Sequence, residues 1–264
     1  MRTLLRLLMN FLPLSTMTKH NRPLLYLRST LYWVCSIINT IVMGAPVLLL
    51  RLVSYEWSAR MSVVWLKVNL WSLKTFCGVT WNVHGTEHIP DYPCLVMSKH
   101  QSTWETYFLP TVLPRSVYVA KKSLSYIPIM GWSIVALNFI MIDRSSGRSA
   151  ISQMVEQARE RFADGISVII FPEGTRMPVG AEPNYRIGGP MVAAETGVDV
   201  LPVATNAGEF WPRMGFIKWP GEITTIFGPV IKTEGKSAEV IRDETQNWIE
   251  AQMKNITVLN RFPY

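Results

Sequence analysis

Twenty consecutive residues without a charged side chain, Leu31 to Leu50, constrain the fold of this chain more than any other feature. A helix of about 20 apolar residues spans roughly 30 Å, which is the thickness of the hydrocarbon core of a bilayer. Arg28 and Arg51 flank the run, while Gly44 and Pro46 weaken it as a straight span. The run therefore predicts a long apolar helix that associates with a membrane.

A second apolar helix is predicted over residues 61–78, where Lys67 and Lys74 accompany a stripe of Trp and Val side chains. Positive residues stand on both sides of the run Leu31–Leu50, so the positive-inside rule assigns no orientation. Two arrangements fit this pattern. Either the two helices form a hairpin that dips into one leaflet, or a single transmembrane helix anchors the chain.

The positive charge is concentrated at the start of the chain. The net charge is +7, from 26 Lys and Arg against 19 Asp and Glu, and residues 1–30 hold five basic residues and no acidic one. The remainder is nearly neutral, which argues against a nucleic-acid-binding protein, because such proteins carry basic residues along one face of the folded domain. Residues 1–14 place Arg2 and Arg6 on one helical face among leucines, which predicts an interfacial helix on anionic lipid. A hydrophobic share of 48% excludes a disordered chain.

From residue 79 onward, short apolar runs alternate with helical stretches. Strands are predicted at Val79–His84, Cys94–Met97, Val117–Ala120, Phe139–Ile142, Ser167–Phe171, Val200–Ala204 and Ile223–Phe227. Helices are predicted at Arg148–Phe162, Gly189–Thr196 and Ala238–Lys254. This alternation is typical of an α/β fold with a mixed, largely parallel sheet flanked by helices. We therefore expect a membrane-anchoring helical region over residues 1–78 and an α/β domain over residues 79–264.

A second uncharged run of 20 residues, Ser123 to Ile142, passes the same hydropathy test as the first. Pro128 and Gly131 lie in its first half, and its last four residues, FIMI, favour a strand. The run is interpreted as a buried helix that leads into a core strand, and not as a membrane span.

Cysteine and histidine spacing provides no metal or disulfide pattern. Cys35, Cys77 and Cys94 are odd in number and widely spaced, which favours three reduced thiols over a disulfide framework or a zinc site. His84 and His88 have the spacing of metal ligands on a helix, but they fall in a predicted strand and turn. No metal is expected there.

His100 and Glu105 directly follow the predicted strand Cys94–Met97. On a continuous helix their side chains would point about 140° apart. They meet only if His100 lies in the strand-to-helix turn and Glu105 in the first helical turn, with Ser102 or Thr103 as the cap. The carboxylate then holds one ring nitrogen and leaves the other to take a proton from a hydroxyl. Taken alone, such a pair is also common as a structural contact.

The hexapeptide Phe171–Arg176 stands at the carboxyl end of a predicted strand, the edge at which open α/β sheets bind ligands. Gly174 lets the backbone approach a ligand closely, and Arg176 offers a planar fork suited to phosphate. Arg144 and Lys121 follow two other predicted strands and add positive charge at the same edge. One base, one carboxylate and several cations there predict a site that deprotonates a hydroxyl beside a phosphate.

These motifs resemble the glycerolipid acyltransferase family, and within it the lysophosphatidic acid acyltransferases. The family signature contains a His and an acid separated by four residues, then I-D-R, F-P-E-G-T-R and an apolar V-P-V block. Here these are His100 with Glu105, Ile142–Arg144, Phe171–Arg176 and Val200–Val203, in matching order over roughly residues 80–230. Two residues depart from the pattern: Glu105 replaces the usual Asp, and Lys99 precedes the His where Asn is common.

The resemblance implies transfer of a fatty acyl group from a thioester of coenzyme A or acyl carrier protein to the sn-2 hydroxyl of lysophosphatidic acid (1-acylglycerol-3-phosphate), giving phosphatidic acid. His100 would be the general base and Glu105 the residue that orients it. The residues implied in substrate binding are Lys121, Arg144, Glu173, Gly174, Thr175 and Arg176. Neither a bound cofactor nor a metal is called for.

Lipid substrates imply contact with membrane phospholipids. We expect a membrane location, with anchoring through the N-terminal region and the catalytic domain facing the cytoplasm. Two alternatives stay open at this point. One is an acyltransferase of the same family that acts on another lysolipid acceptor, and the other is a non-enzymatic membrane lipid-binding protein that keeps only the fold.

Overall fold

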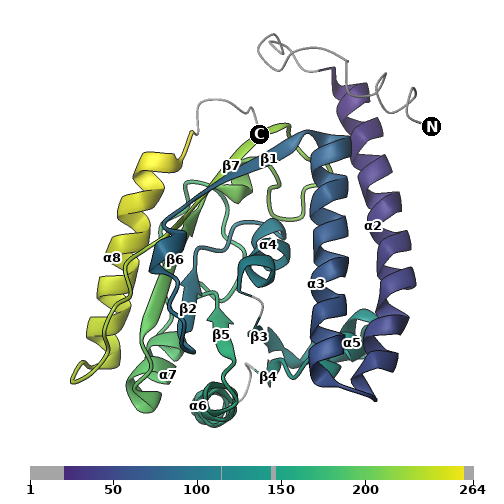
Figure 1. Ribbon diagram of the computed structural model, residues 1–264. Coiled ribbons are helices and arrows are strands. Elements are labelled where there is room, and N and C mark those ends of the chain that lie inside the picture. The colour runs from purple at the N-terminus through teal and green to yellow at the C-terminus, as the bar shows by residue number, and fades with distance from the viewer. Residues whose placement is uncertain (1–20, 114, 144–146, 259–264) are drawn as a thin grey trace.

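The seven predicted strands all form, and they lie in one sheet in the computed structural model, which describes residues 21–113, 115–143 and 147–258 (Figure 1). Each strand begins and ends within two residues of its predicted bounds. They are β1 Val79–His84, β2 Leu95–Ser98, β3 Ser116–Lys121, β4 Ile140–Ile142, β5 Ser167–Ile170, β6 Val200–Thr205 and β7 Gly221–Phe227. The interfacial helix expected over residues 1–14 lies outside the described residues.

The sheet has the strand order β1-β7-β6-β2-β5-β3-β4. Neighbouring strands are parallel in every pair except β6 with β7, which is antiparallel. The expectation of a mixed, largely parallel sheet is therefore confirmed. Because β5 lies between β2 and β3, the loops that follow these three strands leave the same edge of the sheet as neighbours.

Helices cover both faces of the sheet (Figure 1). They are α2 Arg22–Arg51, α3 Tyr55–Ser72, α4 Trp104–Val112, α5 Met130–Ala136, α6 Arg148–Ala163, α7 Gly188–Thr196 and α8 Ala238–Ile256. Shorter turns of other helix types occupy Leu73–Cys77, Thr86–His88, Lys122–Tyr126 (η4) and Ala207–Glu209. The three helices predicted after residue 147 correspond to α6, α7 and α8.

The apolar side chains of strand β2 pack into two hydrophobic cores, one on each face of the sheet. Leu95 and Met97 point into a core shared with α6, α7 and α8, whereas Val96 points into a core shared with α2, α3 and α4. Successive side chains of a strand alternate between faces, so a strand covered on both sides reads as a continuous apolar run. The molecule is thus a sheet between two helical layers.

Helices α2 and α3 form a hairpin joined by Leu52–Ser54, and they lie side by side along their length (Figure 1). Tyr32 of α2 and Leu70 of α3 are buried in the core that also holds Val96 of the sheet. Among the described residues, α2 is the one helix long and apolar enough to cross a membrane, and only 22% of its most apolar window is buried. The hairpin therefore packs on the sheet with one side and leaves an apolar side exposed.

The run Ser123–Ile142 differs from its prediction. Its helix, α5, has only seven residues and is not buried: Trp132 is 53% exposed and Val135 50%. Pro128 has no N–H to give to a helix, so the α-helix begins only after it. The segment lies at the edge of the domain against α2, and no further layer of the described residues covers it (Figure 1). The core strand at its end, β4, is present as expected.

Candidate active site

His100 and Glu105 meet at the carboxyl end of β2. His100 lies in the turn between β2 and α4, Glu105 lies in the first turn of α4, and His100 Nδ1 is 3.0 Å from Glu105 Oε1. The same oxygen accepts hydrogen bonds from the backbone N–H groups of Gln101 and Ser102, both at 2.7 Å. Backbone donors at a helix N-terminus stabilise a carboxylate. The buried Glu105 side chain is thus fixed as the acceptor for the imidazole.

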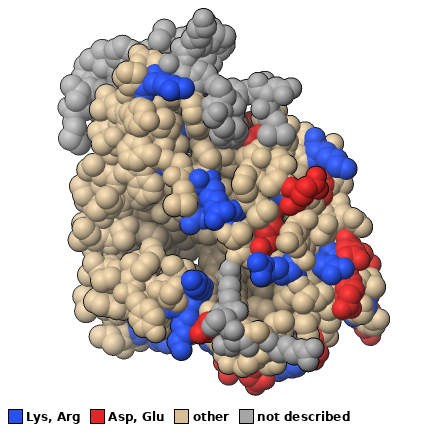
Figure 2. Space-filling view, turned by 180° about the vertical axis from the view of Figure 1, so that it is seen from behind, with Lys and Arg blue, Asp and Glu red and all other residues tan. Residues whose placement is uncertain are grey.

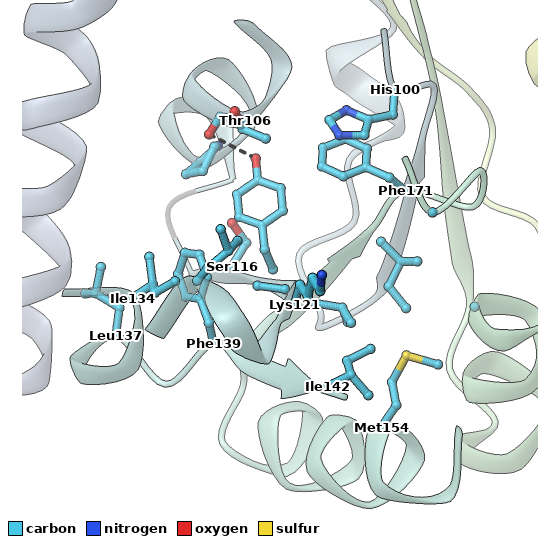
Figure 3. A pocket seen from close by; sticks show the side chains of 18 of the residues that line it. His100, Thr106, Ser116, Lys121, Ile134, Leu137, Phe139, Ile142, Met154 and Phe171 are labelled. Carbon is cyan, nitrogen blue, oxygen red and sulfur yellow. Dashed lines mark hydrogen bonds between the residues drawn. The ribbon is translucent and has the colours of Figure 1, made fainter. Parts of the chain in front are cut away.

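The imidazole of His100 is held flat against a neighbouring aromatic ring. Its centroid lies 3.7 Å from that of Phe171, with an angle of 10° between the planes. Phe171 stacks in turn on Tyr118, whose hydroxyl donates to the carbonyl oxygens of Glu105 and Thr106, both at 3.2 Å. Figure 3 shows the bond to Thr106. With Nδ1 facing Glu105, the other ring nitrogen, Nε2, is the one available to a ligand. A neutral imidazole oriented in this way can accept a proton.

Glu173 takes a position that the sequence did not predict. Its Oε2 accepts a hydrogen bond of 2.8 Å from the backbone N–H of His100, and its Oε1 lies 2.8 Å from Nζ of Lys99. The side chain is fully buried and does not line the cavity described below. The carboxylate points behind His100 and supports its backbone. The expected role of Glu173 in substrate binding stays a prediction.

Lys99 completes a buried polar cluster behind the histidine. Its Nζ lies 2.8 Å from Glu173 and 2.7 Å from Glu250 of α8, which also accepts a hydrogen bond from the hydroxyl of Tyr185. Burial raises the pKa of Glu173 to about 7, although Lys99 and the N–H of His100 act in the opposite direction. Burial lowers the pKa of Lys99, but the two carboxylates outweigh that effect and raise it. Lys99 thus stays a cation that holds two carboxylates together.

The predicted cations are only partly brought together. Arg176 lines the cavity and donates from Nη1 to the hydroxyl of Thr103 at 2.8 Å, and Lys121 at the end of β3 lines the same cavity. Gly174 also lines it, with the positive φ of 71° that its turn requires. Thr175 is exposed and does not line the cavity. Arg144 lies outside the described residues.

A cavity of about 900 Å³ opens beside His100. Most of its lining is apolar, and Figure 3 shows Ile134, Leu137, Phe139, Ile142 and Met154 on the far side from the histidine. The walls come from α3, the segment η4–α5, β3, β4 and α6. Figure 2 shows this face of the molecule hollowed near its middle, with Lys and Arg side chains beside the hollow. A cavity of this size and character suits a long hydrocarbon chain that ends in a polar group.

Sequence reasoning missed three features of the site. The ring of Phe171 stacks on His100, and its place at the end of β5, the strand beside β2, is the signal in the sequence that points to this contact. Arg186 lines the cavity from the loop before α7. Glu250 contacts Lys99 across 151 residues of sequence, and nothing local indicates such a pair.

Comparison with known proteins agrees with these features. The model of the acyltransferase family matches residues 80–206. The chain is 38% identical to the 1-acyl-sn-glycerol-3-phosphate acyltransferase of Pseudomonas aeruginosa over 200 residues. This alignment covers 75% of this chain and 78% of that protein. It is 30% identical over 173 residues to 1-acyl-sn-glycerol-3-phosphate acyltransferase alpha of Homo sapiens, covering 64% of this chain and 61% of that protein.

A solved structure shares the fold. The crystal structure of the 1-acyl-sn-glycerophosphate (LPA) acyltransferase PlsC from Thermotoga maritima matches with a TM-score of 0.74 at 23% identity, covering 90% of this chain and 97% of that one. The resemblance drawn from the sequence motifs is therefore confirmed. The chain is an enzyme and belongs to the acyltransferase family.

Proposed function

We propose that this enzyme transfers a fatty acyl group from an acyl thioester to the sn-2 hydroxyl of 1-acylglycerol-3-phosphate, giving phosphatidic acid. The observation that carries the proposal is the His100–Glu105 pair, whose His100 lines an apolar cavity together with Arg176 and Lys121. A base, cations for a phosphate and space for a hydrocarbon chain are the three features that this acceptor requires. The names of the relatives support the same substrate.

In the proposed reaction, Nε2 of His100 removes the proton of the acceptor hydroxyl while the oxygen attacks the thioester carbonyl. The new C–O bond forms, the tetrahedral intermediate collapses, and the C–S bond breaks. The imidazolium then gives its proton to the departing thiolate, so no acyl-enzyme is needed. Glu105 stabilises the imidazolium in between through its 3.0 Å contact with Nδ1.

Phosphate binding is assigned to the cations that line the cavity. Arg176 is held by its hydrogen bond to Thr103, which spares part of the entropy of ordering a long side chain. Lys121 and the backbone at Gly174 complete this part of the proposed site, and Arg186 is added to it because it lines the same cavity. Coenzyme A and acyl carrier protein both remain as carriers of the acyl donor.

The lipid nature of the acceptor suits a membrane location. We propose that the N-terminal region, including the exposed apolar side of α2, anchors the enzyme to the membrane with the catalytic domain facing the cytoplasm. The boundary between an anchoring region 1–78 and a catalytic domain 79–264 is also a proposal. Tyr32 and Leu70 pack into the core of the sheet, so we expect the two parts to unfold together.

The test is an acyl-transfer assay of the purified full-length protein. Lysophosphatidic acid is compared with lysophospholipids that carry other head groups and with a phosphate-free monoacylglycerol, each with acyl-coenzyme A and acyl-acyl carrier protein. We expect kcat/KM to be highest for lysophosphatidic acid. Equal or higher values for an acceptor without a terminal phosphate would contradict the proposed acceptor.

A further inference from the structure

The segment η4–α5 exposes apolar side chains on its outer side. The exposed fractions of Tyr126, Ile127, Trp132 and Val135 lie between 41% and 74%. These four residues come from the uncharged run Ser123–Ile142, which the sequence alone assigns to the core. A group of large exposed apolar side chains usually marks a surface that contacts a membrane or another molecule.

The inner side of the same segment lines the proposed acyl cavity. Leu124, Met130, Ile134 and Leu137 face that cavity. The segment is therefore a wall one layer thick, with the hydrocarbon site on one side and the surroundings of the protein on the other. A wall with apolar side chains on both sides is suited to separate a hydrocarbon-binding cavity from a medium that is itself apolar.

Helix α2 holds this segment in place. The side chain of Ile129 packs against Gly44, where an added Cβ would clash with Cγ2 of Ile129. The guanidinium of Arg51 donates from Nε to the carbonyl of Ala136 at 2.7 Å. Ile41 precedes Gly44 by about one helical turn and is 58% exposed. The apolar surface of η4–α5 is thus continuous with the exposed apolar strip of α2.

The composition of this combined surface indicates what it binds. On the face that Figure 2 shows, the part of the surface on the α2 side carries few charged residues over most of its height. Lys121 and Lys122 stand at the start of η4, and Arg60 lies over the ring of Trp57 at the hairpin end of α3, with 5.2 Å from Cζ to the ring centroid. Apolar area bordered by Trp, Tyr and basic side chains is the composition that binds a phospholipid interface.

We propose that the outer side of residues 124–137 is a second bilayer-contact surface, which enters the interface beside α2 and brings the wall of the cavity against the lipid. The partner is a phospholipid bilayer and not another protein, because the patch continues onto a helix long enough to cross one. An acceptor lipid would then enter the cavity from the membrane without crossing water. This last consequence rests on the proposed function, whereas the bilayer contact does not.

The test uses the full-length protein with an environment-sensitive nitrobenzoxadiazole label on a single introduced cysteine. Trp132→Cys and Val135→Cys report on the patch. Val240→Cys is the matched control, because Val240 is similarly exposed and its helix, α8, lies at the opposite side of the molecule from α5 (Figure 1). All three carry Cys35→Ser, and the buried Cys77 and Cys94 stay in place. The probe is a vesicle of phosphatidylcholine and phosphatidylglycerol, with and without doxyl-labelled lipid.

We expect labels at 132 and 135 to shift to shorter emission wavelength on vesicles and to be quenched by doxyl lipid, while the label at 240 does neither. Two label positions are used, so that the bilayer contact can still be tested at one position if the variant at the other does not fold. Protein that co-floats with vesicles while both patch labels keep their aqueous spectra would overturn the proposal. Protein that does not bind vesicles at all would overturn it as well.

A kinetic comparison separates this proposal from the proposed reaction. The variant Trp132→Ser with Val135→Ser should raise the apparent KM for vesicle-embedded acceptor several-fold and leave the rate on acceptor in detergent micelles unchanged, because neither side chain lines the cavity. Equal losses in vesicles and micelles would contradict a bilayer role. If the wild type shows no transfer to any acceptor, the proposed function fails, while the fluorescence result still decides the bilayer contact.

Discussion

The backbone N–H of His100 donates to the carboxylate of Glu173, 73 residues further along the chain, at a distance of 2.8 Å. In the opposite direction, the N–H of Met177 donates to the carbonyl oxygen of His100, also at 2.8 Å. These two bonds join the loop after β2 to the loop after β5. The position of the histidine backbone therefore depends on the F-P-E-G-T-R segment as much as on its own turn.

Replacement of the proposed base tests the mechanism directly. His100→Ala is expected to lower kcat by about 10²- to 10⁴-fold, the usual contribution of a positioned general base, without loss of the folded structure. The measurement is steady-state acyl transfer together with circular dichroism. Turnover equal to wild type would show that His100 is not the base.

Glu105 is expected to tolerate a shorter acid better than an amide. Glu105→Gln removes the charge that stabilises the imidazolium and should lower kcat by orders of magnitude, while Glu105→Asp keeps the charge and should retain more of the activity. The difference between the two variants separates charge from packing, since Gln preserves the size of this buried side chain. Equal activity of Glu105→Gln and wild type would contradict the orienting role.

Arg176 is expected to act on acceptor binding more than on donor binding. Loss of one charge-assisted contact to phosphate costs about 1.5–3 kcal/mol, so Arg176→Ala should raise the apparent KM for lysophosphatidic acid roughly 10- to 100-fold. The KM for the acyl donor should change little. Equal increases in both constants would argue against phosphate binding by this side chain.

Removal of Lys99 should destabilise the protein strongly. Lys99→Met leaves the buried carboxylate of Glu173 without its cation, and breaking a buried pair in this way costs about 3–5 kcal/mol. Lys236→Met is the control, because its ion pair with Glu244 is much more exposed and should contribute at most about 1 kcal/mol. Urea denaturation measures both. Similar losses for the two variants would contradict a special role for the buried cluster.

The buried thiols should respond to pH in a defined direction. Burial raises the pKa of Cys77 to about 12 and that of Cys94 to about 11, from an ordinary value of 9.0. Both thiols lose their protons more readily in the unfolded chain, so the free energy of unfolding should fall as the pH rises from about 9 to 11. The double variant Cys77→Ala with Cys94→Ala should show a smaller fall in urea denaturation. If the free energy of unfolding of the double variant depended on pH as in the wild type, the raised pKa values of Cys77 and Cys94 would be contradicted.

The regular part of the fold could be predicted because its signals are local. Runs such as Val200–Ala204 are apolar over a strand length, and a continuous apolar pattern is what a strand covered on both faces produces. The pairing of His100 with Glu105 was also predictable, since a strand-to-helix turn is the one arrangement in which that spacing brings the two side chains together.

The remaining features depend on contacts between distant residues. The direction of the Glu173 side chain follows from the turn at Gly174 and from Lys99, and the partner Glu250 comes from the last helix. For α5, hydropathy does not distinguish a side chain in the core from one that lines a cavity or faces outward. The prediction of a buried helix in this run is therefore wrong for α5, where Trp132 is 53% exposed.

The strand order has a consequence for how the chain folds during synthesis. Strand β2, which carries the histidine, pairs with β5 and β6, and both follow it in the sequence. When β2 leaves the ribosome, neither of its partners has been made. One of its edges stays open until β5 is complete at residue 170, and the other until β6 is complete at residue 205. An unpaired apolar strand is prone to aggregate. This newly made chain therefore depends on the earlier helices α2 and α3 to shield one face of β2 until the sheet closes.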